Sequence, residues 1–343
     1  MAYRFRAGKI TKGTFRRVAA EQIAHAQSAL GAEPVDAANV HRCRKVVKRL
    51  RSLLRLFEGA MSQRTFKAHN RELGEIGRAL SGLRDAHVLE LTIAGLEAHY
   101  GEKARTALAA FKDHIGDLQP VHTSAETQAA LAAARAGFAH AGKRLAKLKL
   151  SRRGFNAISD GLRTTYGRMR AAQLHAYAEP SDENFHELRK AVQWHWRHLA
   201  LLSDSWPEFF NNRARLCRAV GEKIGNDHDL AVLIDTLSKL ASGGVGDPED
   251  AIALARARQG ELRAQCRGTL ERLCVESAKA FTRRVEGYWR CKAPPETGTP
   301  GHDDATPDPA ASPGTVSGGH VRALATPRLA AKSPSLPPSQ QRK

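Results

Sequence analysis

Residues 39–57 read NVHRCRKVVKRLRSLLRLF, and this stretch decides what kind of fold to expect. A helix turns by about 100° per residue, so the positions that share a face can be worked out. With His41 at zero, one face spans about 80° on either side and carries Arg44, Lys45, Lys48, Arg51 and Arg55. The opposite face carries Cys43, Val46, Val47, Leu50, Leu53, Leu54 and Phe57. The pattern predicts an amphipathic helix over 36–58, with its apolar face in a core and its cationic face in solvent.

The cationic face has almost no acids to balance it. Between Asn39 and Gly59 the only acidic residue is Glu58. Like charges stacked three or four residues apart destabilise an isolated helix by about 0.2–0.5 kcal/mol per pair. A face that is merely solvated usually interleaves Glu with Lys. We therefore expect this face to bind an anion.

The whole chain is basic. Its 343 residues include 54 Lys and Arg against 35 Asp and Glu, which gives a net charge of +19. Such a charge attracts polyanions, so nucleic acid, anionic lipid and polyphosphate are the partner classes to weigh. No apolar run reaches the ~18–20 residues that cross a membrane, and the start lacks the apolar stretch of a signal peptide. The five cysteines are an odd number without a close pair, which argues against a disulfide framework and a zinc knuckle. We expect a cytoplasmic protein with reduced thiols, no metal, no cofactor and no membrane partner.

Composition separates a folded body from a tail. Ten of the 15 prolines lie at or beyond Pro294, and residues 293–343 contain no Phe, Trp or Tyr. That segment cannot bury enough apolar area to fold, so we expect a disordered Pro/Ser/Thr-rich tail over 293–343. Residues 1–292 favour helix and hardly show the alternation of a strand, which predicts an all-α fold. The expected helices, of which the last is the longest, are 14–30, 36–58, 62–80, 83–99, 102–117, 124–148, 153–178, 181–203, 206–225, 228–242 and 248–290.

The body contains an internal repeat. Four residues of the first stretch recur 145 positions later: Asn39, His41, Arg44 and Lys45 match Asn184, His186, Arg189 and Lys190. A second match follows in both halves at an offset of 144: Asp85, Val88 and Leu89 match Asp229, Val232 and Leu233. Two features in the same order at a nearly constant offset indicate a duplication. We expect two similar helical halves, 1–150 and 151–292.

The second copy of the basic helix is weaker than the first. His186, Arg189, Lys190, Gln193 and Arg197 share a face, flanked by Trp194 and Trp196. Tryptophan beside cations can stack on Arg or on a base, but large aromatics more often fill the space between helices. His195 falls on the apolar side, which is typical of a core histidine.

These residues resemble a CHAD domain, the conserved histidine α-helical domain. The resemblance rests on the two histidine helices and the two Asp runs: His41, Arg44, Lys48, Arg49, Arg51, His186, Arg189, Lys190, residues 83–89 and residues 229–233. The opening stretch with Gly13, Phe15 and Arg16 also resembles the family. The resemblance covers about residues 5–290 and leaves out the tail.

The resemblance implies two helical bundles related by a pseudo-two-fold axis around a basic central groove or pore. It also implies binding of inorganic polyphosphate and association with polyphosphate granules. The residues that would bind it are His41, Arg44, Lys45, Lys48, Arg49, Arg51, Arg55, His186, Arg189, Lys190 and Arg197. Family members often follow a triphosphate-tunnel domain of the CYTH type, for which this chain has no room, so we expect a stand-alone CHAD protein. Gln193, Trp194 and Trp196 stand where the family usually carries Lys or Arg, which predicts asymmetric binding between the halves.

Polyphosphate suits such a surface because it offers repeated charges and no bases. Arg forks and Lys point charges about 5–6 Å apart along a helix can meet neighbouring phosphates. Binding driven by charge neutralisation should weaken steeply with salt. His41 and His186 would gain charge beside a polyanion and strengthen binding at mildly acidic pH. An affinity that stays constant between about pH 5.5 and 8 would contradict this hypothesis.

Three other functions fit parts of the sequence. Sequence-tolerant nucleic-acid binding is permitted by the charge, although no helix-turn-helix, RRM or KH signature specifies it. A scaffold that binds another protein could use Ser333–Pro338 as a docking peptide. Nothing else in the sequence indicates a protein partner.

A metal-dependent phosphohydrolase is the third alternative. Residues 226–229, Asn-Asp-His-Asp, resemble the His-Asp pair of HD-type hydrolases. A metal site needs further ligands, and the remaining histidines are scattered, among them His69, His87, His114 and His122. Asp85 and Asp229 therefore indicate helix N-caps or ion pairs with a nearby Arg. With no Walker loop, dinucleotide motif or nucleophile elbow, we expect a binding protein and not an enzyme.

Overall fold

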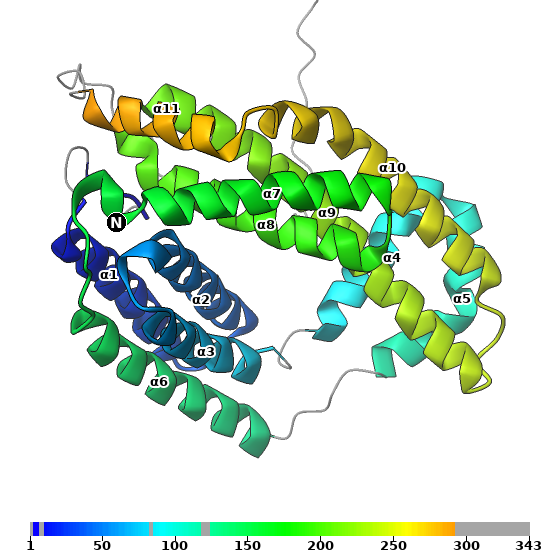
Figure 1. The fold of residues 1–343 in the computed structure, drawn as a ribbon. Helices are drawn as coiled ribbons and strands as arrows, with labels where there is room; N and C mark the ends of the chain where they lie inside the picture. The colour runs from blue at the N-terminus through cyan, green and yellow to red at the C-terminus, as the bar shows by residue number, and fades with distance from the viewer. Residues whose placement is uncertain (1–2, 7–9, 82–84, 118–123, 292–343) are drawn as a thin grey trace, which may run out of the picture. The chain divides into compact units, whose positions relative to one another are not determined.

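Helices account for every regular element that the structure describes. The computed structural model describes residues 3–6, 10–81, 85–117 and 124–291, and no strand occurs within these ranges (Figure 1). The all-α prediction is confirmed. The chain divides into Met1–Pro307 and Asp308–Lys343, and the predicted tail lies outside the described residues. No helix among the described residues is long and apolar enough to span a membrane.

The first group of helices contains nearly all of the basic stretch 39–57, which forms most of the second helix. It consists of α1 (Lys12–Leu30), α2 (Ala37–Leu56), α3 (Gln63–Ala79) and α6 (Ser124–Ala146). Helix α2 packs on α1 and α3, and α6 packs on both α1 and α3. Three of these helices have an N-cap residue whose side chain accepts a hydrogen bond from a backbone N–H of the first turn. These residues are Thr11, Asp36 and Ser62. The 3-10 turn η1 (Glu58–Ala60) follows α2.

The second group repeats part of this order of contacts. It begins after the 3-10 turn η2 (Gly154–Ala157) with α7 (Ser159–Ala178), α8 (Asp182–Leu202), the turn η3 (Ser203–Ser205) and α9 (Pro207–Ser242). Helix α7 packs on α8, α8 packs on α9, and α11 (Ala278–Arg290) packs on α7. Ser181 caps α8, as the Ser-Asp start signal predicts. This parallel order fits a duplication, while the pseudo-two-fold axis and the central pore stay predictions.

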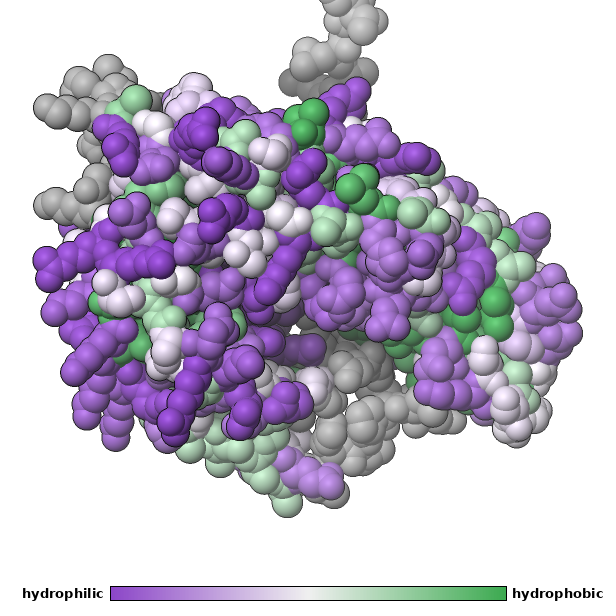
Figure 2. Space-filling view, in the orientation of Figure 1, coloured by the Kyte–Doolittle hydropathy of each residue, from purple (hydrophilic) through white to green (hydrophobic). Residues whose placement is uncertain are grey.

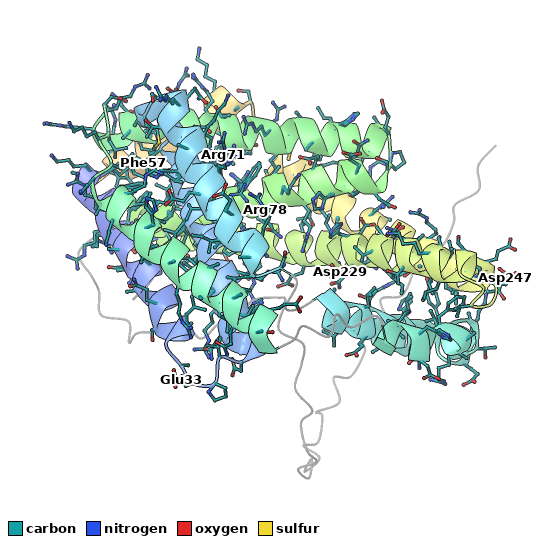
Figure 3. All side chains as sticks on the ribbon, turned by 90° about the horizontal axis from the view of Figure 1, so that it is seen from below. Glu33, Phe57, Arg71, Arg78, Asp229 and Asp247 are labelled. Carbon is teal, nitrogen blue, oxygen red and sulfur yellow. The ribbon has the colours of Figure 1, made fainter. Side chains whose placement is uncertain are left out.

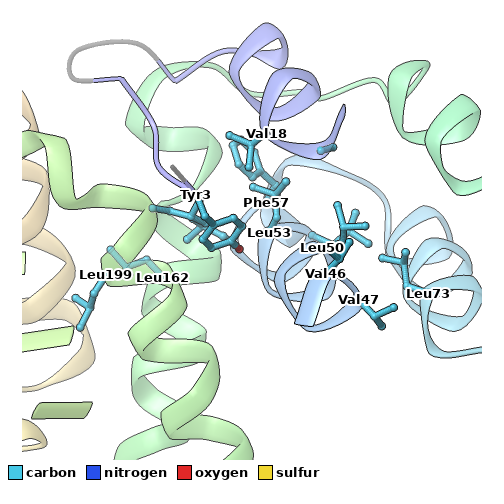
Figure 4. Packing of buried hydrophobic residues seen from close by; sticks show 14 of the residues in the cluster. Tyr3, Val18, Val46, Val47, Leu50, Leu53, Phe57, Leu73, Leu162 and Leu199 are labelled. Atoms are coloured by element: carbon cyan, nitrogen blue, oxygen red, sulfur yellow. The ribbon is translucent and has the colours of Figure 1, made fainter. Parts of the chain in front are cut away.

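One apolar core joins the two groups. Buried side chains of α1, α2, α3 and α6 form a single cluster with those of α7, α8 and α11 (Figure 4). The N-terminal segment contributes Tyr3 and Phe5, and the Phe5 backbone N–H donates to the Leu201 carbonyl at 2.7 Å. At the contact between α2 and α7, Gly161 lies so close to α2 that a Cβ there would be 2.2 Å from the Leu56 carbonyl oxygen. Only glycine allows this approach, because backbone atoms cannot yield to a methyl group.

A second apolar cluster lies elsewhere in the same unit. It is built by α4 (Asp85–Tyr100), α5 (Glu102–Asp117), the C-terminal part of α9 and α10 (Glu249–Leu273). Helix α9 contributes to both clusters, with Val220 and Ile224 in the first and Leu233 and Leu237 in the second.

Two predicted helix boundaries are wrong. The break expected between residues 225 and 228 is absent, and α9 runs unbroken for 36 residues, the longest helix described. The weak helix formers there are held by tertiary contacts, since buried Asp227 accepts a hydrogen bond from Arg263 Nε at 2.6 Å. Conversely, the helix expected over 248–290 breaks after Leu273, where Ser277 caps the start of α11.

Three donors stabilise that break. Arg213 Nη2 and the Tyr166 hydroxyl donate to the Leu273 carbonyl at 2.5 and 2.9 Å, and Arg170 Nε donates to the Cys274 carbonyl at 2.8 Å. The carbonyls at a helix end lack partners in the helix, so these bonds fix where α10 stops.

Candidate functional site

A basic pocket opens between α2 and α3. Its volume is about 370 Å³, and its lining consists of Arg44, Val47, Lys48, Arg51, Asn70, Arg71, Gly74, Gly77, Arg78 and Ser81. Half of these ten residues are cations, and none of the lining residues described is acidic. Hydrophilic side chains cover much of the face that carries α1, α2 and α3 in Figure 2. The pocket is therefore a concentration of positive charge within a broadly polar surface.

The cationic face of α2 lines the pocket because the apolar face of the same helix packs in the core. Val46, Leu50 and Leu53 are buried, whereas Lys48 is exposed and Arg44 is half-buried. Helix α3 lies close to α2 at Gly77, where a Cβ would be 3.4 Å from Val47 Cγ1.

Arg51 of the pocket is fixed by a hydrogen bond. Its Nε donates to Asn70 Oδ1 at 2.9 Å, which ties α2 to α3. Burial lowers the pKa of Arg51, and the nearby charge of Arg78 lowers it further. A group whose charged form is disfavoured by its neighbours gains stability when an anion arrives.

Four of the predicted residues on α2 lie outside the pocket lining. They are His41, Lys45, Arg49 and Arg55. Arg49 donates to Gln22 Oε1 at 3.3 Å and lies over the Tyr3 ring, with 5.3 Å from its guanidinium carbon to the ring centre. His41 and Lys45 are half-buried elsewhere on the helix.

The prediction that Arg55 faces solvent is wrong. Arg55 is buried, and its guanidinium carbon lies 4.0 Å from the centre of the Trp194 ring of α8. It also pairs with Glu58 at 3.8 Å. Burial lowers the pKa of Arg55 to about 10, against the effect of Glu58. Arg55 thus belongs to the contact between α2 and α8, because Trp194 covers it.

The predicted residues of the second half do not line the α2–α3 pocket. Arg197 is buried, donates from Nη1 to the Gln193 carbonyl at 2.8 Å and lies over the Trp196 ring. Trp196 and the helix backbone thus cover Arg197, and its predicted role in binding polyphosphate stays a prediction. Lys190 forms an ion pair with Glu187.

His186 lies against His228 of α9, with 4.4 Å between the ring centres. Burial lowers the pKa of His186, and the charges of His228, Lys190 and Arg189 lower it further, which opposes the gain of charge predicted at mildly acidic pH. Burial also lowers the pKa of Arg189, while the charge of Asp229 raises it.

The predicted core histidine is confirmed. His195 has no exposed surface, and its ring centre lies 5.2 Å from those of both Tyr166 and Phe281. Burial lowers its pKa well below the usual value.

Three polar residues on α3 were missed by the sequence analysis. Asn70, Arg71 and Arg78 supply the wall of the pocket opposite α2, and Figure 3 shows Arg71 and Arg78 along this helix. The signal was present, because Arg71, Gly74 and Arg78 are spaced at three and four residues and therefore share one helix face.

Comparison with known proteins identifies the family. Residues 17–238 match the family model for the CHAD domain. The chain belongs to the CHAD family. Among solved structures, the chain is similar to the CHAD domain of the plant Ricinus communis, at 18% identity, over 86% of this chain and 97% of that chain, with a TM-score of 0.48. No curated protein matches the chain.

Asp182 and Asp227 form ion pairs with Arg263 of α10. Arg263 donates from Nε to Asp227 Oδ1 and from Nη2 to Asp182 Oδ1, both at 2.6 Å. Burial raises the pKa of Asp227; in Asp182 the bonds from Arg256 and Arg263 outweigh burial and lower the pKa. Among the residues described, no group of three or more His, Cys, Asp or Glu could hold a metal ion.

The helix-cap interpretation of Asp229 is wrong. Asp229 lies in the middle of the unbroken α9, and its charge acts on Arg189 of α8, in line with the interhelix alternative (Figure 3). Helix α4 begins at Asp85, whose side chain lies outside the described residues.

Proposed function

We propose that this CHAD domain binds inorganic polyphosphate in the α2–α3 pocket, without catalysing a reaction on it. The observation that carries the proposal is the lining of the pocket, in which five cations and no described acid surround about 370 Å³. Binding would bring the chain to polyphosphate granules in the cytoplasm.

The mixture of cations supports a phosphate chain as the ligand. Four arginines offer planar forks that match two phosphate oxygens at once, and Lys48 adds a point charge. Asn70 and Ser81 add neutral hydrogen-bonding groups. The described lining contains no aromatic residue on which a base could stack, so the site favours phosphate over nucleobase recognition.

The test compares two polyanions on the full chain at about physiological salt, where weak contacts with DNA are largely screened. We expect tight binding of long-chain polyphosphate and weak binding of duplex DNA. Equal or stronger binding of DNA would assign the protein to the nucleic-acid class.

A double variant on α3 assigns the binding to the pocket. Arg71→Ala/Arg78→Ala removes two exposed pocket cations, and we expect the polyphosphate affinity to fall about tenfold or more and the salt slope to fall by about two. The matched control is Arg64→Ala/Lys67→Ala, which removes the same charge from exposed positions of the same helix outside the lining. An equal loss in both variants would mean that net charge, and not the pocket, drives binding.

A further inference from the structure

The acceptor that holds Arg51 differs from those of most other fixed arginines in this chain. Among the described residues, five arginines donate Nε to a carboxylate, namely Arg105, Arg218, Arg263, Arg267 and Arg284, while Arg135 and Arg170 donate Nε to a backbone carbonyl. In the pocket, Arg51 donates Nε to the side-chain amide of Asn70 instead. A guanidinium has donors only, so the amide oxygen must be the acceptor.

The kind of acceptor decides how much positive charge Arg51 can offer to a bound anion. A carboxylate would fix the side chain and cancel its charge at the same time. An amide fixes the side chain and leaves the full positive charge in the pocket, where Arg78 already repels it. The hydrogen bond at Nε also leaves the terminal nitrogens of the fork for a ligand.

We infer that Asn70 is a positioning residue, which fixes the Arg51 guanidinium toward a bound phosphate without neutralising it. The inference rests on the proposed function for the identity of the ligand. Because Asn70 lines the pocket, its NH₂ group adds a neutral donor beside the Arg51 fork.

Asn70→Asp tests the electrostatic part, because it keeps the shape and the acceptor but adds a negative charge. We expect the affinity for long-chain polyphosphate to fall about tenfold, and the slope of log affinity against log salt to fall by about one. The control Gln63→Glu adds the same charge to the same helix at an exposed position outside the lining, and we expect less than a twofold change there. Wild-type affinity and slope in Asn70→Asp, or an equal loss in the control, would overturn the inference.

Asn70→Ala tests the positioning part without any ligand. Exchange of the Arg51 Nε–H with water, followed by NMR, should be slow in the wild type and in Asn70→Asp, and several-fold faster in Asn70→Ala. Equal exchange in wild type and Asn70→Ala would overturn the positioning role. If the wild type did not bind polyphosphate, the proposed function would fail, and this exchange measurement would still decide whether Asn70 positions Arg51.

Discussion

Helices α2 and α8 carry matching residues at an offset of 145, yet their surroundings treat those residues differently. On α2, Arg44 and Lys48 line an open pocket opposite the cations of α3. On α8, the residues at the matching positions are Arg189 and Gln193, and the α9 helix beside them supplies His228 and the charge of Asp229. The comparison teaches that the helix facing a repeated motif decides whether its cations line an open pocket or lie against a histidine and a carboxylate.

The sharpest test removes the matching pair from each half. Arg44→Ala/Lys48→Ala should lower the affinity for polyphosphate at least about 100-fold, since hydrogen bonds to charged groups contribute about 1.5–3 kcal/mol each. Arg189→Ala/Gln193→Ala, which truncates the matching positions, should lower it less than threefold. Titration of the full chain with long-chain polyphosphate measures both. Equal losses would show that the two halves share the binding.

A second test breaks the contact between the helix groups while leaving every charge in place. Gly161→Ala would put a methyl group 2.2 Å from the Leu56 carbonyl oxygen, so we expect the free energy of unfolding to fall by about 2 kcal/mol. Gly167→Ala on the same helix is the control, because its Cβ would make an ordinary contact of 3.6 Å with Ala278. Urea unfolding should show no loss, or a gain of up to about 1 kcal/mol, in the control. Similar losses in both variants would contradict the account of this contact.

The buried faces of α2 and α8 also differ in how they make the stability of the fold depend on pH. The positions of α8 that match Leu50 and Leu53 are His195 and His198, both fully buried. Burial lowers the pKa of His198 to about 3, although its Nε2–H donates to the Ser52 carbonyl at 2.9 Å. Below pH 6.5 the unfolded chain therefore binds a proton that the folded chain excludes, and stability is lost as the pH falls from about 6.5 toward 3.

His198→Leu, which introduces the α2 residue, should remove its share of this pH dependence. Between pH 7 and 5.5, the wild type should lose about 1.3 kcal/mol more stability than the variant. Urea unfolding at the two pH values measures the difference. The same loss in wild type and variant would show that His198 is protonated in the folded state.

The smallest expected effect comes from placing a cation on α8. Gln193→Lys introduces the residue that α2 carries as Lys48. We expect about a twofold gain in polyphosphate affinity at most, because half-buried position 193 lies outside the α2–α3 pocket. A tenfold gain, measured by the same titration, would mean that the second half needs only one charge to bind.

Much of the helical organisation could be predicted from the sequence, because it depends on local signals. The periodicity of α2 and the caps at Asp36 and Ser181 are properties of adjacent residues. The unbroken path of α9 through Asn226 and Asp227 could not be predicted, since Arg263 of α10 holds Asp227.

Of the two helices that line the pocket, only the residues of α2 were predicted from the sequence. A helical wheel places Arg44, Lys48 and Arg51 together, and all three line the pocket. The same wheel places Arg55 beside them, although Trp194, about 140 residues away in the chain, covers it. A wheel describes one isolated helix, so contacts from other helices decide which of its charges stay accessible.

The unbroken α9 has a consequence for how the chain unfolds. With a rise of about 1.5 Å per residue, its 36 residues form a rod of about 54 Å that passes through both apolar clusters. If the part of α9 in either cluster unfolded, the hydrogen bonds of the helix would break in its middle and expose backbone groups there. Melting of one cluster is thereby transmitted to the other, and heat should denature both in one cooperative transition, which gives a single calorimetric peak.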